Sequence, residues 1–133
     1  MHIRVDLPDG KLTNDFPVVS FIRSIYNKDY MWNISYIDFV AKNGSFDNND
    51  YSVSSIENEI NNEKPNGLFV SWNKLMFILK SAFQIYDITI SAFENKVEIM
   101  KFEIFDCSSI EITTGNNEIA NQFDNAIKAM KSC

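Results

Sequence analysis

Alternation of apolar and polar residues predicts strands at several places along the chain. Ile3, Val5 and Leu7 alternate with polar neighbours, which is typical of a strand that is buried on one side. A period of two returns between Trp32 and Val40. Continued through the whole stretch, it places Trp32, Ile34, Tyr36, Asp38 and Val40 on one face and Asn33, Ser35, Ile37 and Phe39 on the other. Further strands are expected at 68–70, 86–92, 97–105 and 110–112.

Helical spacing of apolar residues alternates with these strands. Asp15 is a predicted N-cap before a helix whose first turn holds Pro17, and the run Ser54-Ser55-Ile56-Glu57 has the spacing of a capping box. Ser71 is expected to cap a helix with an apolar face formed by Trp72, Leu75, Met76, Leu79, Ala82 and Phe83. Asn116 or Asn117 should cap a last helix, whose apolar stripe is Ile119, Phe123, Ala126, Ile127 and Met130.

The order of these elements favours one α+β domain over residues 1–133. Turn residues at 94–96 and 106–108 separate consecutive strands, which predicts a three-strand antiparallel meander in the C-terminal half. We therefore expect a mixed, mostly antiparallel sheet of roughly five or six strands, packed against amphipathic helices. A chain of 133 residues is long enough to bury a core without disulfides or metals.

Charge and cysteine usage narrow the range of partners. The formal net charge is −6 and the isoelectric point is about 4.7, which disfavours binding to nucleic acid because that usually needs a basic surface. Cys107 and Cys133 are the only cysteines, which is more typical of a reduced intracellular protein than of a disulfide-stapled one. Without an apolar leader or spanning segment, a cytoplasmic location and no membrane contact are expected.

Residues for the common chemistries are largely missing. His2 is the only histidine, and its place beside the chain start makes a rigid nucleophile–histidine pair improbable. The cysteines are too widely spaced for a zinc site. The acidic run 47–50 is superficially similar to a calcium loop, but Ser52 and Asn58 replace the required glycine and glutamate. Glycines stand singly, so no phosphate-binding loop occurs, and we expect no catalytic residue, metal or cofactor of these types.

Asp38 and the aromatic residues leave alternatives open. On the predicted strand, Asp38 is either buried with a partner or a raised pKa, or solvated at a sheet edge or under a loop. The first alternative would suit a small carboxylate-dependent enzyme that also uses a tyrosine. Trp72 and Phe83 are expected in the core, whereas Trp32 and Tyr36 are either core residues or anchors of an interface.

Carboxylates are concentrated in the middle third of the chain. They form either a solvated face or a surface for a basic protein partner. As the partner-binding set we predict Asp47, Asp50, Tyr51, Glu57, Glu59 and Glu63.

The chain resembles the small immunity proteins of bacterial toxin systems, including those of contact-dependent growth inhibition. The resemblance rests on the acidic α+β character, on the run Leu68-Phe69-Val70-Ser71-Trp72 that leads from a strand into a capped helix, and on the meander from Tyr86 onwards. It implies a protein that binds a cognate toxin and occludes its active site. An interaction subunit without inhibitory activity is a further alternative.

Overall fold

The computed structural model describes residues 2–6, 16–41, 53–106 and 109–131. In chain order the elements are β1 (His2–Asp6), α1 (Val18–Ser24), β2 (Met31–Ala41), α2 (Val53–Asn62), β3 (Leu68–Val70), α3 (Trp72–Ser81), β4 (Ala82–Glu94), β5 (Val97–Phe105), β6 (Ser109–Thr114) and α4 (Asn117–Lys131). The predicted α+β class is confirmed, and no helix in the described ranges is long and apolar enough to cross a bilayer.

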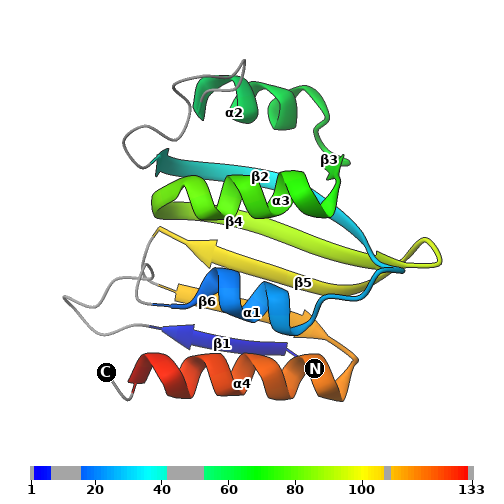
Figure 1. Cartoon of the computed structure of the whole chain (residues 1–133), viewed down its shortest axis with the longest axis vertical. Coiled ribbons are helices and arrows are strands. Elements are labelled where there is room, and N and C mark those ends of the chain that lie inside the picture. Colours follow the sequence, from blue (N-terminus) through cyan, green and yellow to red (C-terminus); the bar gives the residue numbers. More distant parts are fainter. Residues whose placement is uncertain (1, 7–15, 42–52, 107–108, 132–133) are drawn as a thin grey trace.

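One sheet of six strands runs through the molecule in the order β1-β6-β5-β4-β2-β3 (Figure 1). The predicted meander is confirmed as β4, β5 and β6, which pair with one another in sequence. Every strand pairing among the described residues is antiparallel, so the expectation of a mixed sheet is wrong in that detail. Consecutive hairpins need no crossover helix, and this favours antiparallel neighbours.

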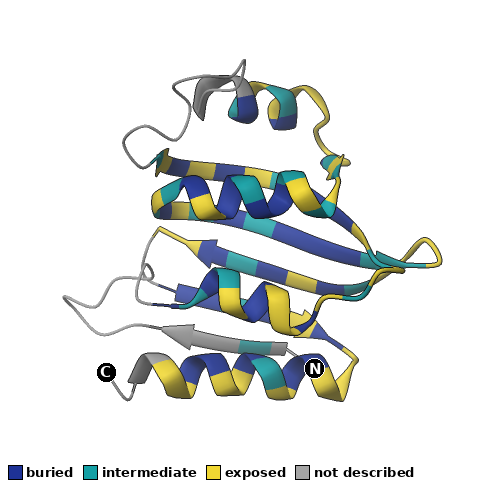
Figure 2. Ribbon diagram, in the orientation of Figure 1, coloured by how far each residue is buried: buried dark blue, intermediate teal, exposed yellow. Residues whose placement is uncertain are grey.

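The helices lie on one side of the sheet and along its ends. In Figure 1, α1 and α3 lie in front of the strands, α4 runs along the β1 end and α2 lies beyond β2. Contacts of α3 with β2, of α4 with β6 and of α1 with both α3 and α4 join these helices into one layer. Figure 2 shows that their buried residues form stripes, whereas their outer sides are exposed. Amphipathic helices therefore shield one face of the sheet.

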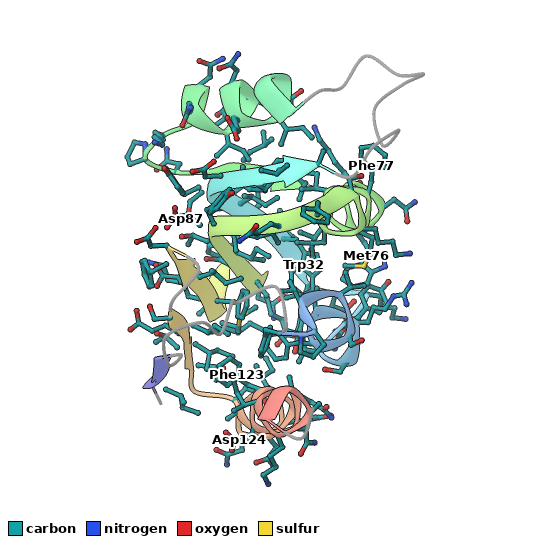
Figure 3. The ribbon with its side chains drawn as sticks, turned by 90° about the vertical axis from the view of Figure 1, so that its left-hand side faces the viewer. Trp32, Met76, Phe77, Asp87, Phe123 and Asp124 are labelled. Atoms are coloured by element: carbon teal, nitrogen blue, oxygen red, sulfur yellow. The ribbon has the colours of Figure 1, made fainter. Side chains whose placement is uncertain are left out.

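Aromatic rings fill the core between α1, α4 and the meander. The ring of Phe102 on β5 lies 5.5 Å from that of Phe21 and 5.7 Å from that of Phe16, measured between centroids. Phe123 on α4 joins them at 5.6 Å from Phe21. Figure 3 shows Phe123 on the side of α4 that faces the sheet. The predicted stripe of the last helix is confirmed for Ile119, Phe123, Ala126 and Ile127, all of which are buried, while the side chain of Met130 lies outside the described residues.

A β-bulge in β2 overturns the uniform alternation predicted for that strand. The register with β4 shifts between Ile34 and Tyr36, so Ser35 is an extra residue without a counterpart. One extra residue reverses the faces of everything that follows it. Ile37 is consequently buried on the same side as Ile34, whereas Tyr36 and Asp38 are exposed on the opposite side.

Helix ends match the sequence signals in part. Lys74 N–H donates to the Ser71 side chain at 3.1 Å, and Ile119 N–H donates to Asn116 Oδ1 at 3.1 Å, which confirms both caps. The predicted cap Asp15 lies outside the described residues, and Pro17 occupies the N-cap position of α1.

Phe83 and Trp72 differ from their predicted places in the core. The helix α3 ends at Ser81, so Phe83 belongs to β4 and is 65% exposed. Trp72, in the first turn of α3, is only partly buried. Tertiary packing of β4 ends the helix before the apolar pattern does.

Candidate functional site

The sheet face that points away from α1 and α3 is the most distinctive surface of the described chain. Figure 3 shows Asp87 projecting from this side, opposite the helical layer. The strand register extends the surface across β3, β2, β4, β5 and β6. We call it the open face and define it by Met31, Tyr36, Asp38, Val40, Phe69, Asp87, Thr89, Lys101, Glu103, Phe105, Glu111 and Thr113.

Large apolar side chains on the open face are unusually accessible. Met31 is 52% exposed and Phe69 is 51% exposed near the short strand β3. Tyr36 is 42% exposed farther along β2, and the ammonium group of Lys64 lies 4.9 Å from its ring centroid. Exposed apolar groups gathered on one surface commonly mark a contact site for another molecule. The Lys64 contact shows that the Tyr36 ring accepts a cation.

Carboxylates lie opposite one another across the strands of the same face. Asp38 on β2 is paired in register with Asp87 on β4, and Glu103 on β5 is paired with Glu111 on β6. Like charges directly opposite each other on neighbouring strands reduce stability. Lys101 provides a positive charge farther along β5, opposite Ser91 and Thr113. Glu111 is also paired in register with Arg4 of β1. A basic group placed between the carboxylates of Asp38 and Asp87 would relieve their repulsion.

Glu57 brings α2 into the same electrostatic environment. Burial and the negative charge of Asp38 raise the pKa of the Glu57 carboxyl, although a hydrogen bond from the backbone N–H of Phe39 opposes the rise. The Glu57 carboxylate therefore accepts a hydrogen bond from the β2 backbone at Phe39. This part of β2 lies beyond residues 32–34, which pair with β3. The side chain of Ser54, its predicted capping-box partner, lies outside the described residues.

The described members of the predicted partner-binding set, Glu57, Glu59 and Glu63, differ in their surroundings. Asp47, Asp50 and Tyr51 lie outside the described residues. Glu57 is half-buried near β2, whereas Glu59 makes an ion pair with Lys74 of α3 at 2.7 Å. Residues two apart on a helix point in different directions, which explains the separation. Glu63, just after α2, is exposed.

Asp38 is exposed, so the solvated alternative is the observed one. The bulge, rather than a buried environment, determines its position. Trp32, which was predicted to share its face, is buried on the helix side at 2% exposure. The sequence signal that would have revealed the open face is the alternation of Lys101, Glu103 and Phe105 with buried residues of β5.

In the described ranges, histidine, cysteine and carboxylate side chains form no group of three or more that could hold a metal ion. Comparison of the chain with protein-family models, with curated proteins and with solved structures gave no match. The function is therefore argued from the open face itself.

Proposed function

We propose that this protein is an inhibitor that acts by binding another protein, as an immunity protein does, and that the open face holds a basic domain of a cognate toxin in the cytoplasm. The proposal rests on the position of exposed aromatic side chains beside carboxylates on the open face. Tyr36 and Phe105 lie among the carboxylate pairs Asp38–Asp87 and Glu103–Glu111 on a face without a covering helix in the described structure.

Two contributions would favour binding: burial of the exposed aromatic side chains, and neutralisation of the carboxylates by a basic partner. Tyrosine and other aromatic residues supply much of the binding energy at protein interfaces. The carboxylates of Asp38 and Asp87 lie opposite each other in the free protein, so a lysine or arginine from the partner gains more there than at an isolated carboxylate. A net charge of −6 also steers a basic partner during approach.

A toxin that acts on nucleic acid provides the matching chemistry. Its active site must attract phosphates and is therefore commonly basic. An acidic protein that covers such a site competes with the substrate for the same cations. The resulting inhibition is occlusion, and it requires no catalytic residue on this chain.

The test uses the product of the gene directly upstream of this one as the candidate toxin. Co-expression of the wild-type chain should rescue cells from that product, and the purified proteins should form a complex. The triple variant Asp38→Asn, Asp87→Asn and Glu103→Gln should lower the association rate by about tenfold or more at low salt, and by less at high salt. Asn at position 87 retains the acceptor for the N–H of Asp106, which donates to Asp87 at 2.9 Å.

A matched control neutralises exposed acidic side chains away from the open face. The variant Asp29→Asn, Glu118→Gln and Asp124→Asn removes the same formal charge from exposed positions between α1 and β2 and on α4. Its association rate should fall much less, because steering depends on where charge lies as well as on its total. Equal effects of the two triple variants would reject the open face as the interface. Failure of the wild-type chain to rescue cells or form a complex would reject this toxin as the partner.

A further inference from the structure

A lysine of the chain itself lies over an aromatic ring of the open face. Lys64 belongs to the segment between α2 and β3, and its Nζ atom is 4.9 Å from the centroid of the Tyr36 ring on β2. Both residues are exposed. In the part of the chain that the structure describes, the Lys64 ammonium group makes no ion pair, so a neighbouring carboxylate does not impose its contact with the ring. A cation of this chain therefore occupies a position that a partner can reach.

Two carboxylates lie beside that ring on the same face. Asp38 follows Tyr36 by two residues on β2, which places it about 7 Å farther along the strand. Asp87 is the register partner of Asp38 on β4. The backbone N–H of Asp106 donates to Asp87 Oδ1 at 2.9 Å, and this hydrogen bond leaves Oδ2 of the same carboxylate unused. An aromatic ring and two opposed carboxylates thus form one small patch.

An arginine side chain matches this patch better than a lysine side chain does. The planar guanidinium group stacks on aromatic rings, and its N–H groups donate to carboxylates from a fixed fork. One guanidinium group could therefore cover the Tyr36 ring and direct N–H groups toward Asp38 and Asp87. A lysine ammonium group is compact and strongly hydrated, and at the ring it would only replace the Lys64 ammonium by another of the same kind.

We propose that Tyr36, Asp38 and Asp87 form a subsite for one arginine side chain of the partner, and that this arginine displaces Lys64 from the ring. The inference rests on the proposed function, because the arginine belongs to the basic protein that the open face holds. In the free chain, Lys64 competes for the ring and weakens the binding of any cation that gains nothing else. Arginine overcomes this competition through its additional hydrogen bonds to the carboxylates. Lys64 thereby sharpens the preference for arginine over lysine.

The contact between Lys64 and Tyr36 is tested first, in the free protein. The ring current of Tyr36 should shift the Lys64 ε-methylene resonances in a ¹³C–¹H spectrum. Tyr36→Leu should abolish that shift, whereas Tyr36→Phe should retain it because phenylalanine keeps a ring that accepts a cation. Identical Lys64 resonances in the wild type and in Tyr36→Leu would overturn the proposed competition.

The arginine preference is tested with N-acetylarginine methylamide as the probe. This probe should shift the amide resonances of Asp38 and Asp87 saturably, and it should move the Lys64 ε-methylene resonances toward their positions in Tyr36→Leu. The citrulline analogue has nearly the same shape without the charge and should do neither at the same concentrations. The lysine analogue should bind at least about threefold more weakly than the arginine probe. Equal affinities of the arginine and lysine probes would overturn the arginine preference, and no saturable response would reject the subsite.

Lys64→Gln should tighten binding of the arginine probe by about twofold to fivefold, the scale of an exposed cation–π contact. Lys101→Gln removes the same charge from another exposed position of the open face and should tighten binding less. Equal gains in both variants would reduce Lys64 to a general charge and overturn its displacement. The toxin is absent from these titrations. Binding of the probe without a toxin complex would therefore support the subsite and reject that partner, whereas a toxin complex without probe binding would reject the subsite alone.

Discussion

The two faces of the sheet are built from alternate residues of the same strands, yet they meet different environments. On β5, Phe102 and Ile104 are buried against the helices, whereas Lys101 and Glu103 project from the other side. On β2, Ile37 is buried and Tyr36 is 42% exposed, although the two residues are adjacent. The helix-covered face holds the apolar core, whereas the open face exposes charged and aromatic side chains to solvent.

Asp38 and Asp87 illustrate this difference. They lie opposite each other on the open face, so replacing Asp38 by a neutral residue is expected to stabilise the free protein. On the covered face, by contrast, aromatic and aliphatic side chains pack against one another. Strand alternation thus separates the apolar core from the exposed carboxylates.

The largest effect is expected in the aromatic core. Phe123→Ala should lower the free energy of unfolding by about 3–5 kcal/mol, because it leaves a cavity beside Phe21 and Phe102. Urea denaturation measures the loss. Phe123→Leu serves as the control and should lose clearly less, since it refills most of the volume. A loss below about 0.5 kcal/mol for the alanine variant would remove α4 from the core.

A neighbouring pair on β2 sharpens the comparison between the faces. Ile37→Ala should cost about 2–5 kcal/mol of unfolding free energy, because Ile37 is buried after the bulge. Tyr36→Ala should cost less than about 1 kcal/mol, because Tyr36 is 42% exposed and lies outside the core. Chemical denaturation of both variants under one set of conditions checks the difference. A larger loss of stability for Tyr36→Ala than for Ile37→Ala would instead support the uninterrupted alternation predicted from the sequence.

The smallest expected effect is a change in the pH dependence of the unfolding free energy, caused by Glu57 and Asp38. The folded-state pKa of Glu57 is raised, so its contribution to stability is fully present below the unfolded pKa and is lost as the pH rises through the folded pKa. Asp38→Asn removes a repulsion on Glu57 and faces Asp87 with a neutral group. Stability at neutral pH should therefore rise by a few tenths of a kcal/mol, roughly the scale of an exposed charge pair.

Unfolding free energies at about pH 4 and pH 7 measure that shift. The decrease in stability on going from the lower to the higher pH should be smaller for Asp38→Asn than for the wild type. Asp124→Asn is the control, because Asp124 is exposed on the helix α4 and is not part of the strand pairing that places Asp38 opposite Asp87. A steeper decrease in the Asp38 variant would contradict the assigned repulsion.

The sequence by itself determined the order and types of the elements. Helical spacing identified α3 and α4, and Ser71 and Asn116 marked their starts, because capping and amphipathicity act within a few neighbouring residues. The sequence also predicted the meander, because short turns place consecutive strands side by side. These features depend on local chemistry.

Only the tertiary structure decided which side chains share a surface. The alternation of apolar and polar residues did not reveal the bulge at Ser35, yet this bulge places Tyr36 and Asp38 on the open face. Pairing between strands then places Asp38 beside Asp87, a residue far along the chain. Such proximity is fixed by register and packing across the whole sheet, because no local pattern specifies which distant strand becomes a neighbour.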